Sequence, residues 1–129
     1  MQFSRARNAR IRAIQDRDHA EIRRMQRVLH DSIIEGVGME KIIVCSKQLI
    51  EATLAHFESE ERAMDEESLG SLNAHQELHA ELIETLEDIS KDLEKRSIGG
   101  AMQLMRFFEG RMAHHLKIED AIFESEIQG

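Results

Sequence analysis

Residues 56–64 read His-Phe-Glu-Ser-Glu-Glu-Arg-Ala-Met, and the interpretation of the whole chain starts from this stretch. Residues four apart lie on one face of an α-helix, about 40° apart in angle and about 6 Å apart along the axis. His56 and Glu60 could therefore reach one metal ion together. The same spacing recurs at His75 and His79. These pairs predict helices that carry metal ligands, and the remaining segments decide what kind of site they form.

The composition favours an all-α protein. The chain has 129 residues, with no proline, tryptophan or tyrosine. Good helix formers dominate (Glu, Leu, Ala, Arg, Met and Lys), and the alternating patterns typical of strands are almost absent. The length predicts one domain spanning residues 1–129, long enough to bury a core without disulfides.

The charge is unevenly distributed along the chain. Residues 1–30 contain eight arginines and three acids, whereas the remainder contains nine basic and 22 acidic residues. The net charge of the whole chain is −8. The acidic bulk disfavours nucleic acid as a partner. The Arg-rich start is either a solvated arm or a contact surface, with an acidic protein as its candidate partner. No apolar run is long enough for a membrane span, and the single cysteine suits a reducing compartment, so we expect a cytoplasmic protein.

Apolar residues recur in steps of three and four and predict four helices. Gly36 and Gly38 end the first segment, and a second turn is expected at residues 97–100. Gly110, inside the last segment, predicts close packing between helices. Helices of this length with short connections form an up-down-up-down antiparallel four-helix bundle. The expected helices follow an N-terminal arm of residues 1–10 and span about 11–35, 39–64, 71–96 and 101–126.

Five histidines fall on or beside the inward stripes of these helices, which is unusual for a polar residue. A buried imidazole needs a partner, and a metal site shared by all five supplies one. With the carboxylates Glu60 and Asp120, the set is too large for one zinc ion, and iron or manganese suits its mixed nitrogen and oxygen ligands better than calcium or magnesium. A di-iron site is the resulting prediction. The five are His19, His56, His75, His79 and His115, whereas His30 and His114 are expected outside the site.

With these residues in place, the sequence resembles the hemerythrin family in its short bacterial form over about residues 16–123. Every helix carries part of the resemblance, and the motifs occur in the family's order. They are Asp-x-x-His ending at His19, His-Phe-x-x-Glu-Glu-x-x-Met beginning at His56, His-x-x-x-His from His75 to His79, and His-Leu-x-x-x-Asp from His115 to Asp120.

The resemblance implies a role for each ligand and two iron ions as the cofactor. One iron would be bound by His75, His79 and His115, and the other by His19 and His56. Glu60 and Asp120 would bridge the pair together with an oxo or hydroxo group. The second iron would then keep one open position, where dioxygen binds in the family.

The oxygen pocket is expected at Met112 and Leu116, which match positions that line it in the family, with Phe57 as a further candidate. The sequence departs from the family at Arg111-Met112, where a Trp-Leu pair often stands. Because arginine cannot seal a pocket as tryptophan does, we expect a looser pocket and faster autoxidation.

The function implied is reversible dioxygen binding for storage, delivery or sensing, without catalysis. The alternative is a di-iron enzyme or sensor that acts on nitric oxide or peroxide, or a protein that handles iron. No further acid, base or tyrosine near the ligand set favours the enzyme. Dioxygen is the expected small-molecule partner, and neither nucleic acid nor a membrane is expected.

Overall fold

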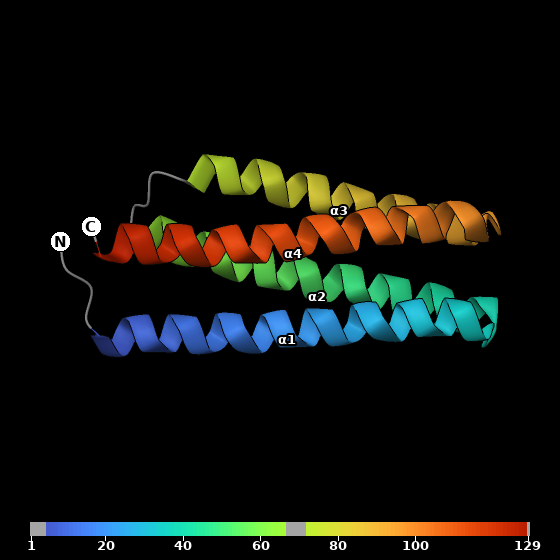
Figure 1. Cartoon of the computed structure of the whole chain (residues 1–129), viewed down its shortest axis with the longest axis horizontal. Coiled ribbons are helices and arrows are strands. Elements are labelled where there is room, and N and C mark those ends of the chain that lie inside the picture. The colour runs from blue at the N-terminus through green and yellow to red at the C-terminus, as the bar shows by residue number, and fades with distance from the viewer. Residues whose placement is uncertain (1–4, 67–71, 129) are drawn as a thin grey trace.

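The structure, a computed structural model, consists of four α-helices, and the residues that it describes contain no strand (Figure 1). The all-α expectation is confirmed. The described backbone covers residues 5–66 and 72–128, and within it the side chains of residues 5–12, 14–15, 63–64, 66, 72, 116 and 118–128 are left undescribed. The helices are α1 (Arg5–Glu35), α2 (Met39–Glu66), α3 (Leu72–Glu94) and α4 (Ile98–Gln128).

The helices run up, down, up and down, as the sequence predicts. Helices α1 and α3 are diagonal partners, and each packs against α2 and α4; the contact between α1 and α4 is the least extensive. The α1–α2 and α3–α4 turns lie at one end of the bundle, and α1 begins and α4 ends at the other (Figure 1).

Helix α1 begins earlier than expected. Its first residue is Arg5, so residues 5–10, which the sequence placed in an arm, are helical. The expected boundary followed the apolar stripe, which starts at Ile11. Arginine and alanine are good helix formers without any apolar stripe, and nothing in residues 5–10 interrupts a helix.

Both tight turns end their helices in the same way. Gly36 has a φ of +66°, and the N–H groups of Gly36 and Val37 donate to the carbonyls of Ile33 and Ser32, both at 3.3 Å. This pairing satisfies carbonyls left over at the end of α1. After α3 the left-handed residue is Arg96, with a φ of +64°. The second turn therefore precedes the expected residues 97–100, and α4 starts at Ile98 instead of about 101.

The core is a continuous apolar cluster along the bundle axis, built from the inward stripes of all four helices. Phe108, Leu29 and Leu49 are completely buried within it. Gly110 does not mark a close helix contact, because a Cβ atom added there meets nothing within 4 Å. In the described part of the chain, no helix is both long and apolar enough to traverse a lipid bilayer.

Candidate metal centre

Six of the seven predicted ligands come together in the interior of the bundle. Helix α1 contributes His19, α2 contributes His56 and Glu60, α3 contributes His75 and His79, and α4 contributes His115. Each of these side chains is between 1% and 4% exposed. The stripes of the four helices explain this placement, because each ligand occupies a position where an apolar residue would otherwise face the core. The seventh, Asp120, belongs to α4, but its side chain lies outside the described set.

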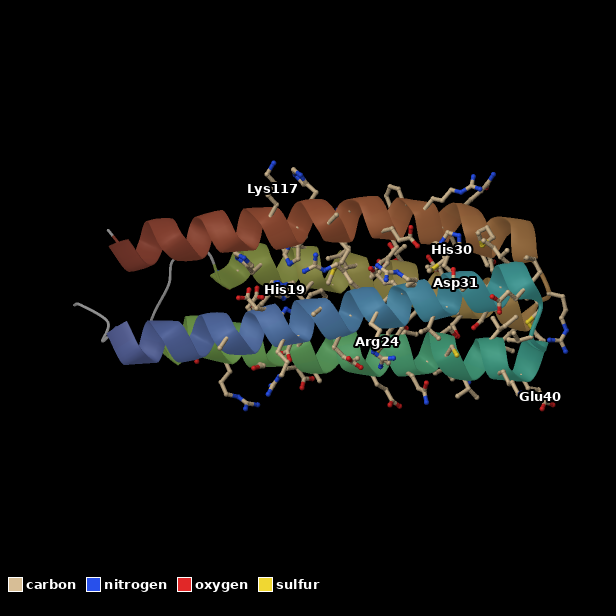
Figure 2. All side chains as sticks on the ribbon, turned by 60° about the horizontal axis from the view of Figure 1, so that its bottom comes forward. His19, Arg24, His30, Asp31, Glu40 and Lys117 are labelled. Carbon is tan, nitrogen blue, oxygen red and sulfur yellow. The ribbon has the colours of Figure 1, made fainter. Side chains whose placement is uncertain are left out.

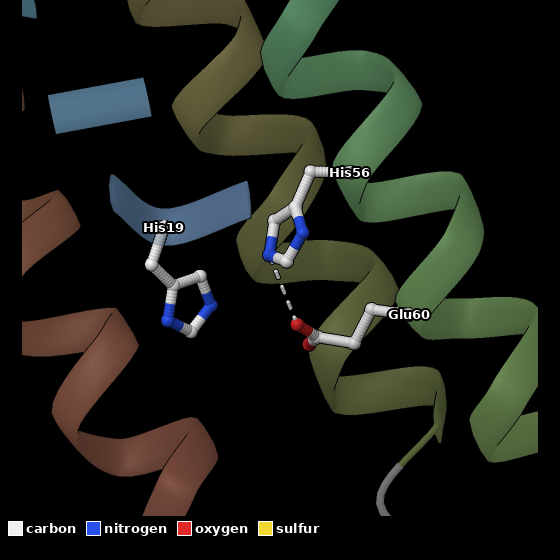
Figure 3. Close-up of side chains that lie close together, drawn as sticks. All are labelled: His19, His56 and Glu60. Atoms are coloured by element: carbon white, nitrogen blue, oxygen red, sulfur yellow. Dashed lines mark ion pairs between the residues drawn. The ribbon is translucent and has the colours of Figure 1, made fainter. Parts of the chain in front are cut away.

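Glu60 lies between two groups of imidazoles. Its Oε2 is 3.3 Å from Nε2 of His56, and its Oε1 is 3.4 Å from Nε2 of His79 and 3.8 Å from Nε2 of His75. Figure 3 shows the first group, in which His19 and His56 point toward the Glu60 carboxylate. The two carboxylate oxygens thus face different sets of ring nitrogens, which is the arrangement required of a bridging ligand.

The potential ligand atoms are close enough for metal ions. One ligand atom from each of His19, His56 and Glu60 lies within 4.8 Å of the others, and the same holds for Glu60, His79 and His115. Glu60 is the member that the two groups share. The same carboxylate is therefore available to a cation in either group.

Two further carboxylates hold the outer nitrogens of the histidine rings. Nδ1 of His56 donates to Oδ2 of Asp18 at 3.1 Å, and Nδ1 of His79 donates to Oε2 of Glu61 at 2.8 Å. Such bonds fix the tautomer, so that Nε2 carries the lone pair, and they orient the Nε2 atom of each ring toward Glu60. The sequence offered a signal for both carboxylates, because each is the direct neighbour of a predicted ligand, but it assigned them no role.

Phe57 packs directly against the ligand set. Its ring is stacked on that of His79, with 3.8 Å between centroids and 3° between planes, and it meets the ring of His115 edge-on at 5.8 Å. Met112 is 1% exposed and lines a pocket of about 570 Å³ that also reaches His19. Their role in an oxygen pocket stays a prediction, and the side chain of Leu116 lies outside the described set.

A second, smaller pocket of about 290 Å³ reaches His115 from between α3 and α4. Gly110 and Arg111 line it, and Arg111 leans outward: its Nη2 donates to Oε2 of Glu81 at 2.7 Å, and its guanidinium lies 5.4 Å from the centre of the Phe107 ring. Arg111, where the resemblance led us to expect tryptophan, therefore leaves open space beside His115.

The surroundings of His115 keep its imidazole in the neutral form. Burial lowers the pKa of His115 from its ordinary 6.5 to about 3; the neighbouring ring of His79 adds to this, and the Glu60 carboxylate opposes it. His115 is therefore neutral at physiological pH, and a neutral imidazole is the form that binds a metal. The two other histidines lie outside the cluster: His30 pairs with Glu109, and His114 is exposed.

Comparison with known families agrees with this geometry. A family model described as the Hemerythrin HHE cation binding domain matches residues 10–127. The chain belongs to the hemerythrin family. The comparisons with curated proteins and with solved structures gave no significant match. The assignment matches the resemblance that the ligand motifs suggested.

The donor set of this hemerythrin chain fits a cation cofactor. Five buried imidazoles and a shared carboxylate supply the nitrogen and oxygen ligands that borderline divalent metals prefer. A buried carboxylate among so many ring nitrogens is costly unless positive charge accompanies it. Membership of the family and the cluster together support metal binding at this position.

Proposed function

We propose that the chain binds dioxygen reversibly at a pair of iron ions, for storage, delivery or sensing. The observation that carries the proposal is the position of Glu60, whose two oxygens face separate imidazole groups. Three histidines (His75, His79 and His115) would hold one iron, and two (His19 and His56) the other. Asp120, five residues beyond His115 on α4, would supply the second bridging carboxylate.

The unequal division of imidazoles is the basis for reversible ligand binding. His19 and His56 would hold their iron with one imidazole fewer than His75, His79 and His115 would supply to the other, which would leave room for a small molecule beside His19 and His56. When bound, the iron pair would supply the two electrons for reversible binding of dioxygen.

The surrounding side chains of the chain have distinct tasks in this proposal. Asp18 and Glu61 hold the rings of His56 and His79 in place through their Nδ1–H groups. Phe57 and Met112 provide apolar walls that limit water near the ligands. The open space beside Gly110 and Arg111 works against this exclusion, and it supports the expectation of fast autoxidation.

The test is an oxygenation experiment on the purified chain. Iron is quantified, the protein is reduced without air, and its near-ultraviolet and visible spectrum is followed through cycles of oxygen and argon. We expect two irons per chain and a charge-transfer band that returns with each cycle. Irreversible oxidation with rapid consumption of peroxide would instead favour an enzyme, and one zinc or no metal would refute both functions.

A matched pair of variants tests the ligand assignment. His56→Ala removes a proposed ligand of the open iron and should abolish the reversible band. His114→Ala removes an exposed histidine next to a ligand and should leave the band intact. Oxygen binding that survives His56→Ala unchanged contradicts the assignment.

A further inference from the structure

The pocket between α1 and α4 extends beyond the candidate metal ligands. It has a volume of about 570 Å³, within the range of small-molecule sites in proteins. Figure 2 looks onto this side of the bundle, where His19 and His30 mark α1 and Lys117 marks α4. The lining residues that matter here are His19, Arg23, Gln26 and Arg27 of α1, and Met112 and Ala113 of α4.

Gln26 is a buried amide whose nitrogen has no assigned partner. The side chain is 8% exposed and lines the pocket. Its Nε2 atom is buried and has no hydrogen-bond partner among the described residues. Buried polar groups are nearly always hydrogen-bonded, so a small rotation of this side chain, which lines the pocket, would give the amide an acceptor on a molecule bound there.

Two arginines flank this amide on the same face of α1. Arg23 and Arg27 are four residues apart, so their side chains start about 6 Å apart along the helix, with Gln26 between them. Nε of Arg23 donates to the backbone oxygen of His19 at 3.4 Å. Within the described part of the chain, no carboxylate forms an ion pair with either guanidinium.

The acidic residues of the pocket do not cancel this positive charge. Glu109 is engaged by Nδ1 of His30 at 3.3 Å. Asp16 lies about two helical turns before Arg23, at the end of the pocket near His19. Arg23 and Arg27 thus place two exposed guanidinium groups at the pocket beside the buried amide of Gln26, on a protein whose overall charge is −8.

We propose that this pocket binds a small oxyanion, a free phosphate or a small organic acid, through the guanidinium groups of Arg23 and Arg27 and the amide of Gln26. Guanidinium groups match the geometry of carboxylate and phosphate oxygens, and the amide adds a neutral donor. The anion lies about one helical turn from His19, beside the metal centre but held by other residues. The inference does not depend on which metal or gas the centre binds.

The test measures anion binding by titration calorimetry at low ionic strength. Inorganic phosphate and succinate are titrated separately into the purified, metal-loaded chain. Tighter binding of phosphate identifies a phosphate group as the natural determinant, and tighter binding of succinate identifies a carboxylate. In either case Arg27→Gln should weaken binding about tenfold or more, because it removes a charge-assisted hydrogen bond. Gln26→Glu should abolish binding, because it sets a like charge against the anion.

Arg24→Gln is the matched control. Arg24 neighbours Arg23 but is paired with Glu21 and does not line the pocket (Figure 2). Its substitution should leave both affinities unchanged. Equal affinity in the wild type, Arg27→Gln and Arg24→Gln overturns the proposal, because the anion then binds elsewhere. Absence of binding in the wild type overturns it as well and assigns the pocket to water.

Two measurements on the same samples keep these outcomes separate. Circular dichroism and thermal melting verify the fold of each variant, and the exposed position of Arg27 keeps the test decisive even if Gln26→Glu does not fold. The metal content is also determined. A metal-loaded chain that binds no anion refutes only the pocket, and anion binding by a chain without iron refutes only the oxygen-binding function.

Discussion

The hydrogen bond between His79 and Glu61 gives the sharpest prediction about the metal centre. At 2.8 Å it is shorter than the bond between His56 and Asp18, which measures 3.1 Å. Glu61→Gln keeps the shape of the side chain and an oxygen that can accept from Nδ1, but it removes the negative charge. The change therefore isolates the contribution of that charge to metal affinity.

The magnitude follows from the type of hydrogen bond. A bond to a charged group contributes about 1.5–3 kcal/mol and a neutral one about 0.5–1.5 kcal/mol, a difference of about 1–1.5 kcal/mol. The Glu61 side chain is 24% exposed, so solvent reduces this difference and the lower part of the range applies. We expect Glu61→Gln to weaken cation binding about fivefold to tenfold, at the lower end of effects known for such supporting residues.

A competition titration measures this effect. Ferrous iron is distributed between the chain and a chromophoric chelator without air, for wild type and variants. Glu60→Gln removes the shared carboxylate and should lose far more affinity than Glu61→Gln. Glu58→Gln alters an exposed acid on the same helix and should bind iron as the wild type does. The reasoning fails if Glu61→Gln and Glu58→Gln bind iron equally well.

Four further predictions concern stability and the pocket. Arg96→Gly should raise the free energy of unfolding by about 1 kcal/mol in urea titration, because Arg96 adopts a left-handed φ of +64° that glycine adopts without strain; no gain would mean that the turn tolerates arginine freely. Phe108→Ala should lower that free energy by about 3–5 kcal/mol, since Phe108 is completely buried, whereas Phe107→Ala, at a residue 52% exposed, should cost far less; equal losses would contradict the assigned core. Arg111→Trp should slow autoxidation by covering the space beside His115, as measured by loss of the oxygenated spectrum in air, and an unchanged rate would remove Arg111 as its cause. In the metal-free chain the folded pKa of His115, about 3, lies below its ordinary 6.5, so the unfolded state binds more protons between these values. Thermal melts should therefore show stability falling as the pH drops below 6.5, and melting temperatures that stay constant from pH 7 to pH 4 would contradict the shift.

The sequence predicted the positions of the candidate ligands because the helical spacing that places apolar residues in the core also places these side chains there. His56 and Glu60 occupy inward positions of a stripe with steps of three and four, and so do His75 and His79. Any bundle that buries those stripes must bring these side chains inward. The helix order and the antiparallel arrangement followed from the short connections between the stripes.

The residues that the sequence did not assign depend on how the helices are rotated against each other. Asp18 and Glu61 act across a helix interface, and their partners lie 38 and 18 residues away along the chain. Periodicity places them near the edge of a stripe but cannot specify which ring they meet. The pocket at Arg23, Gln26 and Arg27 likewise forms against residues of α4 such as Met112 and Ala113, which only the packed structure brings opposite them.

The starts of α1 and α4 differ from the expected boundaries for another reason. The expected start of α1 followed apolar residues, whereas the helix itself extends to Arg5 through intrinsic propensity. The second turn was expected at residues 97–100 because of Gly99 and Gly100. Arg96 adopts the left-handed conformation instead, and both glycines lie in α4. A non-glycine residue at such a position gives no signal in the sequence.

The two tight turns at one end of the bundle have a consequence for local unfolding. His19 precedes Gly36 by 17 residues and His115 follows Ser97 by 18, so the ligands lie roughly 26 Å along the helices from the turns. The end with the turns is held by chain continuity, whereas cations bound by the two ligand groups, which together draw on all four helices, would cross-link the opposite half. That half then forms a cooperative unit of its own, and the free energy needed to open it rises with the concentration of free cation.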